Sequence, residues 1–207
     1  MYADHVPFLA SEIKARASTF KRAIMFACLS ARVQFPRVPD QMKDVTKRKE
    51  QSPALWSWKI DTYRYVEEHG EKLFAHIIAH GTMTAAALNT LMAIPGLGIV
   101  KGAFVLQMLG HDIACLDVRN IQREGLNPRA YRSDGMGRKS GAAFERKMAR
   151  YIAQTQGRAA ELWDRWCTEV AKDYGYSADQ ISWMHVDAIV TNARTKFDQF
   201  NGTDIPF

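Results

Sequence analysis

Apolar side chains recur at the spacing of an α-helix along almost the whole chain, and this pattern limits the folds open to the sequence. Between residues 8 and 33, one stripe of apolar or small residues follows a single helix face: Ile13, Ala17, Phe20, Ile24, Cys28 and Ala31. No segment shows the sustained alternation of apolar and polar residues that is typical of a β-strand. The sequence therefore predicts an all-α fold.

Turn-forming residues divide this pattern into expected helices. We expect them over residues 8–33, 53–69, 71–79, 82–94, 99–109, from about 117, 142–174 and 178–200. The stretch 34–53 contains Pro36, Pro39 and a basic run, which indicates a loop or a boundary. The glycine-rich and basic stretch 127–141 predicts a mobile loop.

The chain has 207 residues, enough for one sizeable core or for two lobes that share a cleft. We expect two helical lobes. Residues 51–125 form the first, and residues 1–50 together with 126–207 form the second, so that the N-terminal helix packs with the C-terminal helices.

The net charge of +6 and the pI near 9.3 favour a polyanionic partner such as nucleic acid. The apolar runs are too short to span a bilayer, and the N-terminus has no secretory signal, so we expect no membrane association. Cys28, Cys115 and Cys167 are too few and too scattered for a disulfide framework, a zinc site or an iron–sulfur cluster. A reducing, cytoplasmic setting is expected.

A tight turn between two apolar helices is the most informative motif. The segment Leu91-Met-Ala-Ile-Pro-Gly-Leu-Gly98 precedes an apolar helical stretch. Glycines permit the turn, and the second helix begins with unpaired N–H groups that can hold a phosphate at the positive end of the helix dipole. This predicts a helix–hairpin–helix unit in which Gly96, Leu97, Gly98 and Lys101 contact a DNA backbone without reading its sequence.

Asp117 extends this motif. With an aspartate at that distance from the hairpin, residues 82–123 resemble the helix–hairpin–helix DNA glycosylase superfamily, which has the endonuclease III-like fold. The resemblance implies two helical lobes, with the hairpin and the aspartate facing a cleft into which a DNA base is flipped. It also implies that Asp117 is catalytic, because a carboxylate can stabilise the positive charge that develops on the sugar or orient an attacking water. The alternative role of Asp117 is the N-cap of the following helix.

The chain also departs from the superfamily pattern. Members that cleave the DNA backbone have a lysine two residues after the last hairpin glycine, where this sequence has Val100. Lys101 is one place later, and we expect it to point away from the sugar and to contact phosphate rather than to act as a Schiff-base nucleophile. The C-terminal iron–sulfur cluster common in the superfamily is absent, and no cofactor is expected.

Basic residues are concentrated between positions 119 and 150, just after Asp117. Arg119, Arg138 and Lys139 are therefore candidate DNA contacts, and a solvated basic surface is the alternative. His76 and His80 have possible metal-ligand spacing, but no third ligand is nearby, so no metal site is expected.

Two further patterns carry less weight. Trp56, Trp58, Tyr63 and Tyr65 could include a ring that stacks on a flipped base, although most of them are expected in the core. His185 and Asp187 are two positions apart and would diverge on a helix, so they are not expected to form a catalytic pair.

The leading hypothesis is a DNA glycosylase-like enzyme that hydrolyses an N-glycosidic bond without lyase activity. Two alternatives remain open. The first is a relative of the phage glycosylase-like transferases, which add an amine or amino acid to activated 5-hydroxymethyluracil in DNA. The second is a non-catalytic helix–hairpin–helix DNA-binding protein. The identity of the base and the oligomeric state are left open by the sequence.

Overall fold

The structure, a computed structural model, describes residues 1–127, 131 and 141–202. This part of the chain consists of helices and their connections and has no β-strand, which confirms the predicted all-α class. In chain order the elements are α1 (Tyr2–Ala15), α2 (Ala17–Leu29), the 3₁₀ helix η1 (Phe35–Arg37), α3 (Val38–Arg48), the 3₁₀ helix η2 (Lys49–Gln51), α4 (Trp58–His80), α5 (Thr84–Met92), α6 (Ile99–Met108), α7 (Val118–Arg123), α8 (Ala142–Thr155), α9 (Ala159–Tyr174), α10 (Ala178–Ile189) and α11 (Ala193–Gly202).

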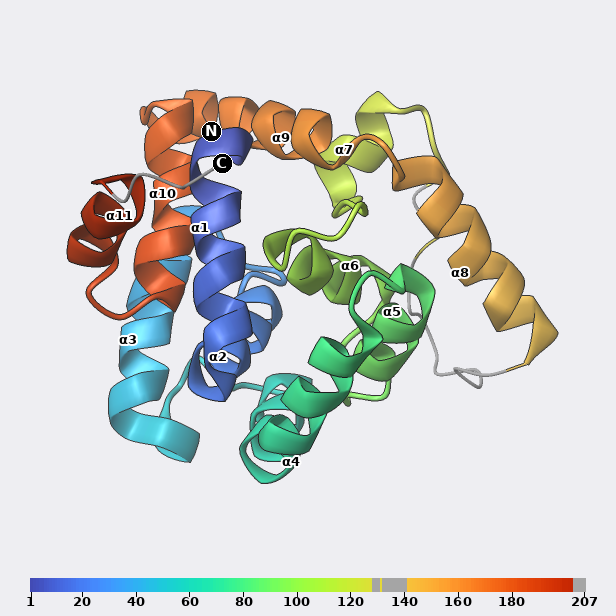
Figure 1. The fold of residues 1–207 in the computed structure, drawn as a ribbon, viewed down its shortest axis with the longest axis horizontal. Coiled ribbons are helices and arrows are strands. Elements are labelled where there is room, and N and C mark those ends of the chain that lie inside the picture. Colours follow the sequence, from blue (N-terminus) through green and yellow to red (C-terminus); the bar gives the residue numbers. More distant parts are fainter. Residues whose placement is uncertain (128–130, 132–140, 203–207) are drawn as a thin grey trace.

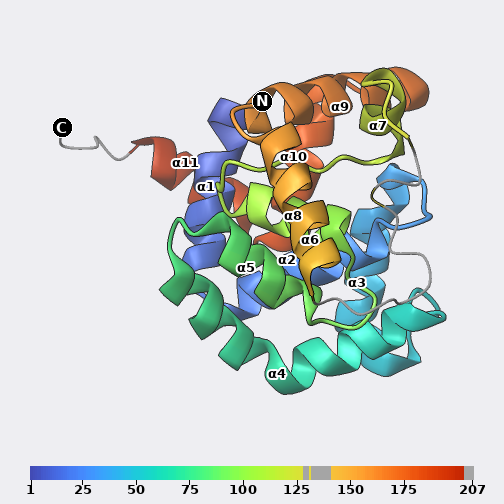
Figure 2. The same ribbon diagram turned by 90° about the vertical axis from the view of Figure 1, so that its right-hand side faces the viewer.

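Helix α6 occupies the centre of the molecule in both views (Figures 1 and 2). Every residue from Gly102 to Met108 is buried, and the helix packs against α1, α2 and α5. A helix that is apolar on all sides is stable in water only when other elements enclose it. The apolar sequence of α6 therefore accounts for its central place.

The N-terminal helix α1 packs against two helices from the C-terminal part of the chain, α9 and α10 (Figure 1). Helix α2 packs against α3 and α10 on one side and against α4 and α6 on the other. One continuous apolar core consequently joins the segments that the sequence assigns to different lobes. The lobe boundaries at residues 51 and 125 remain a prediction.

Three of the expected long helices are interrupted. Arg16 is extended, with φ −147° and ψ 126°, and separates α1 from α2. Gly157 has φ +75°, a left-handed conformation that terminates helices, and it lies between α8 and α9. Asn192, with φ +56°, lies between α10 and α11. The single helices expected over 8–33, 142–174 and 178–200 are therefore wrong.

Two helices occur where a break was expected. Helix α3 begins within the stretch predicted to be a loop, since Pro36 and Pro39 occupy first-turn positions, where proline costs no hydrogen bond. Gly70 lies inside α4 and does not end it. A Cβ atom at this position would overlap the side chain of Lys21 on α2, so the glycine allows the two helices to approach closely.

Other boundaries follow the sequence prediction. A turn over residues 93–98 joins α5 to α6, and Asp117 is the N-cap of α7. Ser177 caps α10 through a capping box with Gln180.

No helix in the described residues combines the length and the apolar character that crossing a bilayer requires.

Candidate active-site cavity

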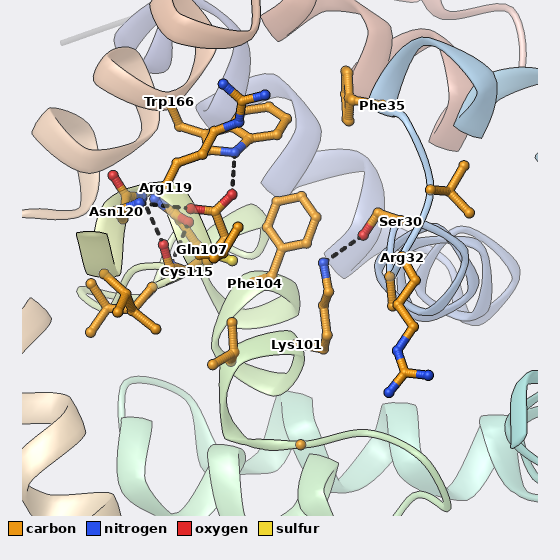
Figure 3. Close-up of a pocket in the computed structure, with 18 of the residues that line it drawn as sticks. Ser30, Arg32, Phe35, Lys101, Phe104, Gln107, Cys115, Arg119, Asn120 and Trp166 are labelled. Carbon is orange, nitrogen blue, oxygen red and sulfur yellow. Dashed lines mark hydrogen bonds between the residues drawn. The ribbon is translucent and has the colours of Figure 1, made fainter. Parts of the chain in front are cut away.

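A cavity of about 1450 Å³ lies beside the helical hairpin. Its walls come from segments far apart in the sequence: residues 30–35 after α2, the start of α4, the hairpin with α6, residues 115–121, and one face each of α9 and α10. Figure 3 shows the part of this cavity between α6 and α9. The hairpin, Lys101 and Asp117, which the sequence singled out, all reach it.

The hairpin is fixed against α4. Gly96 has φ +77°, which favours glycine, and a Cβ atom there would overlap the ring of Trp58 and lie 2.8 Å from Oγ1 of Thr62. The Thr62 hydroxyl donates a hydrogen bond of 2.7 Å to the carbonyl oxygen of Pro95. The turn is thus anchored by one hydrogen bond and by a contact that only glycine permits.

The start of α6 presents backbone N–H groups beside the cavity. Gly98 is the N-cap residue, and no side chain caps the helix. Gly96 and Gly98 line the cavity, whereas the Leu97 side chain is buried in the core and 1% exposed. Of the predicted hairpin contacts, Leu97 could therefore reach a phosphate only through its backbone.

Lys101 lies inside the cavity, and its expected orientation relative to a DNA sugar stays a prediction. Its ammonium group donates a 2.7 Å hydrogen bond to Oγ of Ser30 and lies 5.4 Å from the ring centroid of Phe104 (Figure 3). Val100 lines the same cavity. Both residues of the first turn of α6 therefore line the same cavity, and Lys101 is the one that reaches Ser30.

Asp117 is the N-cap of α7, and it also lines the cavity, so its catalytic role stays a prediction. Oδ1 accepts a hydrogen bond of 3.0 Å from the backbone N–H of Asn120, as an N-cap does. Oδ2 accepts one of 2.6 Å from the indole N–H of Trp166 on α9. The two donors fix the orientation of the carboxylate at the cavity wall.

Side chains hold the irregular segment that leads to Asp117. The Tyr151 hydroxyl, fully buried, accepts from the N–H of Leu116 at 2.8 Å and donates to the carbonyl of Ala114 at 2.9 Å. The N–H of Cys115 donates to Oε1 of Gln107 at 3.0 Å. Buried backbone groups outside a helix need such partners, and here they also set the position of the next residues along the chain.

Aromatic rings form much of the cavity wall. Phe35 meets Trp166 edge to face, with centroids 4.8 Å apart, and Phe104 faces the same space (Figure 3). Of the four aromatic residues proposed from the sequence between positions 56 and 65, Trp58 alone lines the cavity. Such walls suit a planar ring, since an aromatic base is stabilised by stacking.

The arginines after Asp117 are engaged with α9. Arg119 pairs with Asp173, and Arg123 pairs with Glu169. Arg119 lines the cavity, but its charge is already compensated by a carboxylate. The predicted contacts Arg138 and Lys139 lie outside the described residues.

Glu124 completes the link between α7 and α9. Its carboxylate accepts hydrogen bonds from Arg158 and Arg165, at distances from 2.7 to 3.0 Å. These two guanidinium groups lower the pKa of Glu124 to about 2. The ion pairs of Arg119, Arg123, Arg158 and Arg165 thus hold α7 and its C-cap residue Glu124 against α9.

Two further titratable groups line the cavity. Burial raises the pKa of the Cys115 thiol to about 12, so it is protonated at neutral pH and is a poor nucleophile. Burial lowers the pKa of His185 to about 3, so its imidazole is neutral. Asp187, its neighbour in sequence, is exposed and does not line the cavity.

The described residues contain no group of His, Cys, Asp and Glu arranged to hold a metal ion.

Sequence reasoning missed several residues of this site. Phe35 lies in the stretch interpreted as a loop, and Trp166 lies in the expected helix over 142–174 without a motif that singles it out. Gln107 had a recognisable signal, because it is the one polar residue between Gly102 and Leu109 in an apolar helix.

Comparisons of this chain with protein-family models, with curated proteins and with solved structures give no match.

Proposed function

We propose that this protein is a DNA-acting enzyme that hydrolyses the N-glycosidic bond of a base held in the cavity, with Asp117 as the catalytic carboxylate. One observation carries the proposal. The oriented carboxylate of Asp117, the start of α6 at the hairpin and the aromatic rings Phe35 and Trp166 line a single cavity. We also propose that it acts on DNA in the cytoplasm of a bacterial or phage-infected cell.

Each part of the cavity has a role in this reaction. The unpaired N–H groups at the start of α6 bind a backbone phosphate next to the target nucleotide. The rings stack on the flipped base. As the bond breaks, positive charge grows on the sugar, and the carboxylate of Asp117 stabilises it. The hydrogen bond from Trp166 holds that carboxylate in place before the charge develops.

Lys101 acts in this proposal as a cation that contacts phosphate. Its ammonium group donates to Ser30, just after the C-terminal end of α2, where the helix dipole favours positive charge. A Schiff-base nucleophile must be a neutral amine. We therefore expect no lyase activity, and borohydride should trap no covalent complex with a processed DNA. A trapped complex that disappears in Lys101→Met would assign Lys101 to catalysis instead.

The direct test is mass spectrometry of free bases and nucleosides after incubation with DNA. The substrates are DNAs that carry damaged, 5-hydroxymethylated or pyrophosphorylated pyrimidines. Release of a free base supports hydrolysis. Binding of these DNAs without any change in their nucleosides would favour the non-catalytic DNA-binding alternative.

The decisive variant is Asp117→Asn, which keeps the shape of the side chain and removes its charge. Turnover should be abolished while DNA binding persists. The asparagine NH₂ group would face a second N–H donor, since both carboxylate oxygens accept hydrogen bonds, and this mismatch costs about 1–3 kcal/mol of stability. Thermal unfolding must therefore accompany the assay. Asp61→Asn, which changes an exposed carboxylate on the same cavity, is the matched control and should retain turnover.

A specific observation favours base modification as the second candidate. Arg32 lines the cavity near Lys101 (Figure 3), and neither cation is paired with a carboxylate in the described part of the chain. Hydrolysis of a neutral base does not need cations beside the aromatic rings, whereas departure of a phosphorylated leaving group from an activated base does. A transferase would convert the substrate nucleoside into a heavier one in the same experiment.

A further inference from the structure

Three polar side chains line the cavity and are themselves buried: Gln107, Asn120 and His185. Gln107 donates to the carbonyl of Ala159 and accepts from the N–H of Cys115. Both groups of the Asn120 amide are also engaged. His185 differs from them, because one of its ring nitrogens has no partner in the described part of the protein.

The contacts of His185 define its hydrogen-bonding state. Nδ1 lies 3.0 Å from the carbonyl oxygen of Ile181 and 3.3 Å from that of Ser182, so Nδ1 carries the proton and donates it. Nε2 is then the nitrogen with the lone pair, and it is the unpartnered atom. A buried acceptor without a donor costs about 1–3 kcal/mol.

The surroundings of His185 offer no donor. Phe35 and Trp163 lie against its ring, with centroids 4.7 and 4.4 Å away, and Phe26, Phe104 and Trp166 complete the enclosure. The two indole N–H groups are used elsewhere, since Trp163 donates to Ser182 and Trp166 donates to Asp117. The described protein atoms thus leave the Nε2 acceptor without a hydrogen-bond donor.

We propose that His185 determines the specificity of the cavity: its Nε2 accepts a hydrogen bond from an N–H group of the bound heterocycle. This inference rests on the proposed function and adds the substrate class, namely bases that present an N–H donor on the edge opposite the sugar. Because His185 is neutral, its Nε2 can accept but cannot donate. Nε2 is itself buried, so the proposed hydrogen bond requires one of the neighbouring rings to rotate aside when the base binds.

Uracil-type nucleosides give the sharpest probe, because N3–H is the only donor on their base. We would measure the affinities of the wild-type protein for 2′-deoxyuridine, thymidine and 3-methyl-2′-deoxyuridine. Thymidine controls for size, since it has an added methyl group and keeps N3–H. The two nucleosides with N3–H should bind about tenfold more tightly than the 3-methyl compound, the ratio expected for one hydrogen bond.

The same comparison in variants assigns the preference to one residue. His185→Met and His185→Phe should bind all three nucleosides with similar affinity. His5→Phe is the matched control, since His5 is also buried among aromatic rings but lies outside the cavity lining, and it should keep the tenfold preference. If neither His185 variant folds, the three affinities of the wild-type protein still test whether the cavity prefers a base with an N3–H group.

The outcomes separate this inference from the proposed function. Equal affinity of the wild-type protein for the methylated and unmethylated nucleosides, or no binding of any of them at millimolar concentration, would overturn the inference. So would a preference that survives in a folded His185 variant. A preference that depends on His185, in a protein that neither binds nor processes DNA, would overturn the proposed function and leave the inference in place.

Discussion

Gly96 shows how tightly one backbone position in the hairpin is constrained. Its φ of +77° is unfavourable for other residues, and an added Cβ would overlap Trp58. We expect Gly96→Ala to lower the free energy of unfolding by about 2–4 kcal/mol, the sum of a backbone cost and an overpacking cost. Gly81→Ala is the control in urea unfolding, because Gly81 has φ +54° with open space around it and should show the backbone cost alone. Equal losses in both variants would contradict the proposed contact.

His185 predicts a pH dependence of stability. Its pKa is about 3 in the folded protein against an ordinary value of 6.5, so the unfolded chain binds a proton at a higher pH than the folded one does. Stability that is present above pH 6.5 is therefore lost as the pH falls, by up to about 1.4 kcal/mol per pH unit from this residue.

We expect His185→Met to lose less stability than the wild-type protein between pH 6.5 and about 5.5, a window above the ordinary pKa values of carboxylates. Urea unfolding at several pH values measures this difference. His76→Met, a change at an exposed histidine, should keep the wild-type pH dependence. Parallel curves for wild-type and His185→Met would show that the buried imidazole does not resist protonation.

The backbone of the segment before α7 is held by hydrogen bonds to the side chain of Tyr151 on α8. Tyr151→Phe leaves a buried N–H and a buried carbonyl without their partner, which costs about 2–3 kcal/mol. Because this segment leads directly to Asp117, we also expect turnover to fall more than DNA affinity does. Kinetics and thermal unfolding of the variant measure the two effects. Tyr176→Phe, at an exposed position, should change neither.

The sequence predicts the helical class and the hairpin because apolar spacing and glycine positions are local signals. It does not predict the break at Arg16, where no glycine or proline is present, and it misreads Gly70, whose role is a contact with α2. The hydrogen bond from Trp166 to Asp117 joins residues from separate helices and has no local signal. The place of Phe35 in the cavity wall likewise follows from tertiary packing and could not be predicted from the sequence.

The chain has a net charge of +6, but several of its basic side chains form ion pairs within the protein. Arg119, Arg123, Arg158 and Arg165 are compensated by acidic partners on α7 and α9. Lys101 and Arg32, at the cavity, have no carboxylate partner in the described part of the chain, and they lie near the start of α6. Of these six basic residues, the two without a carboxylate partner thus lie at the cavity beside the hairpin.

This distribution predicts how salt affects DNA binding. Affinity should fall as the salt concentration rises, because each phosphate contact releases counterions. Lys101→Met should weaken binding to all sequences alike and reduce the slope of log K against log salt by about 0.9 on duplex DNA, the effect of one phosphate contact. Lys43→Met, at an exposed lysine on α3 outside the cavity lining, is the control and should keep the wild-type slope. An unchanged slope in Lys101→Met, or a loss that depends on sequence, would remove Lys101 from the phosphate-binding role, and then α6 would have to hold the backbone through its N–H groups alone.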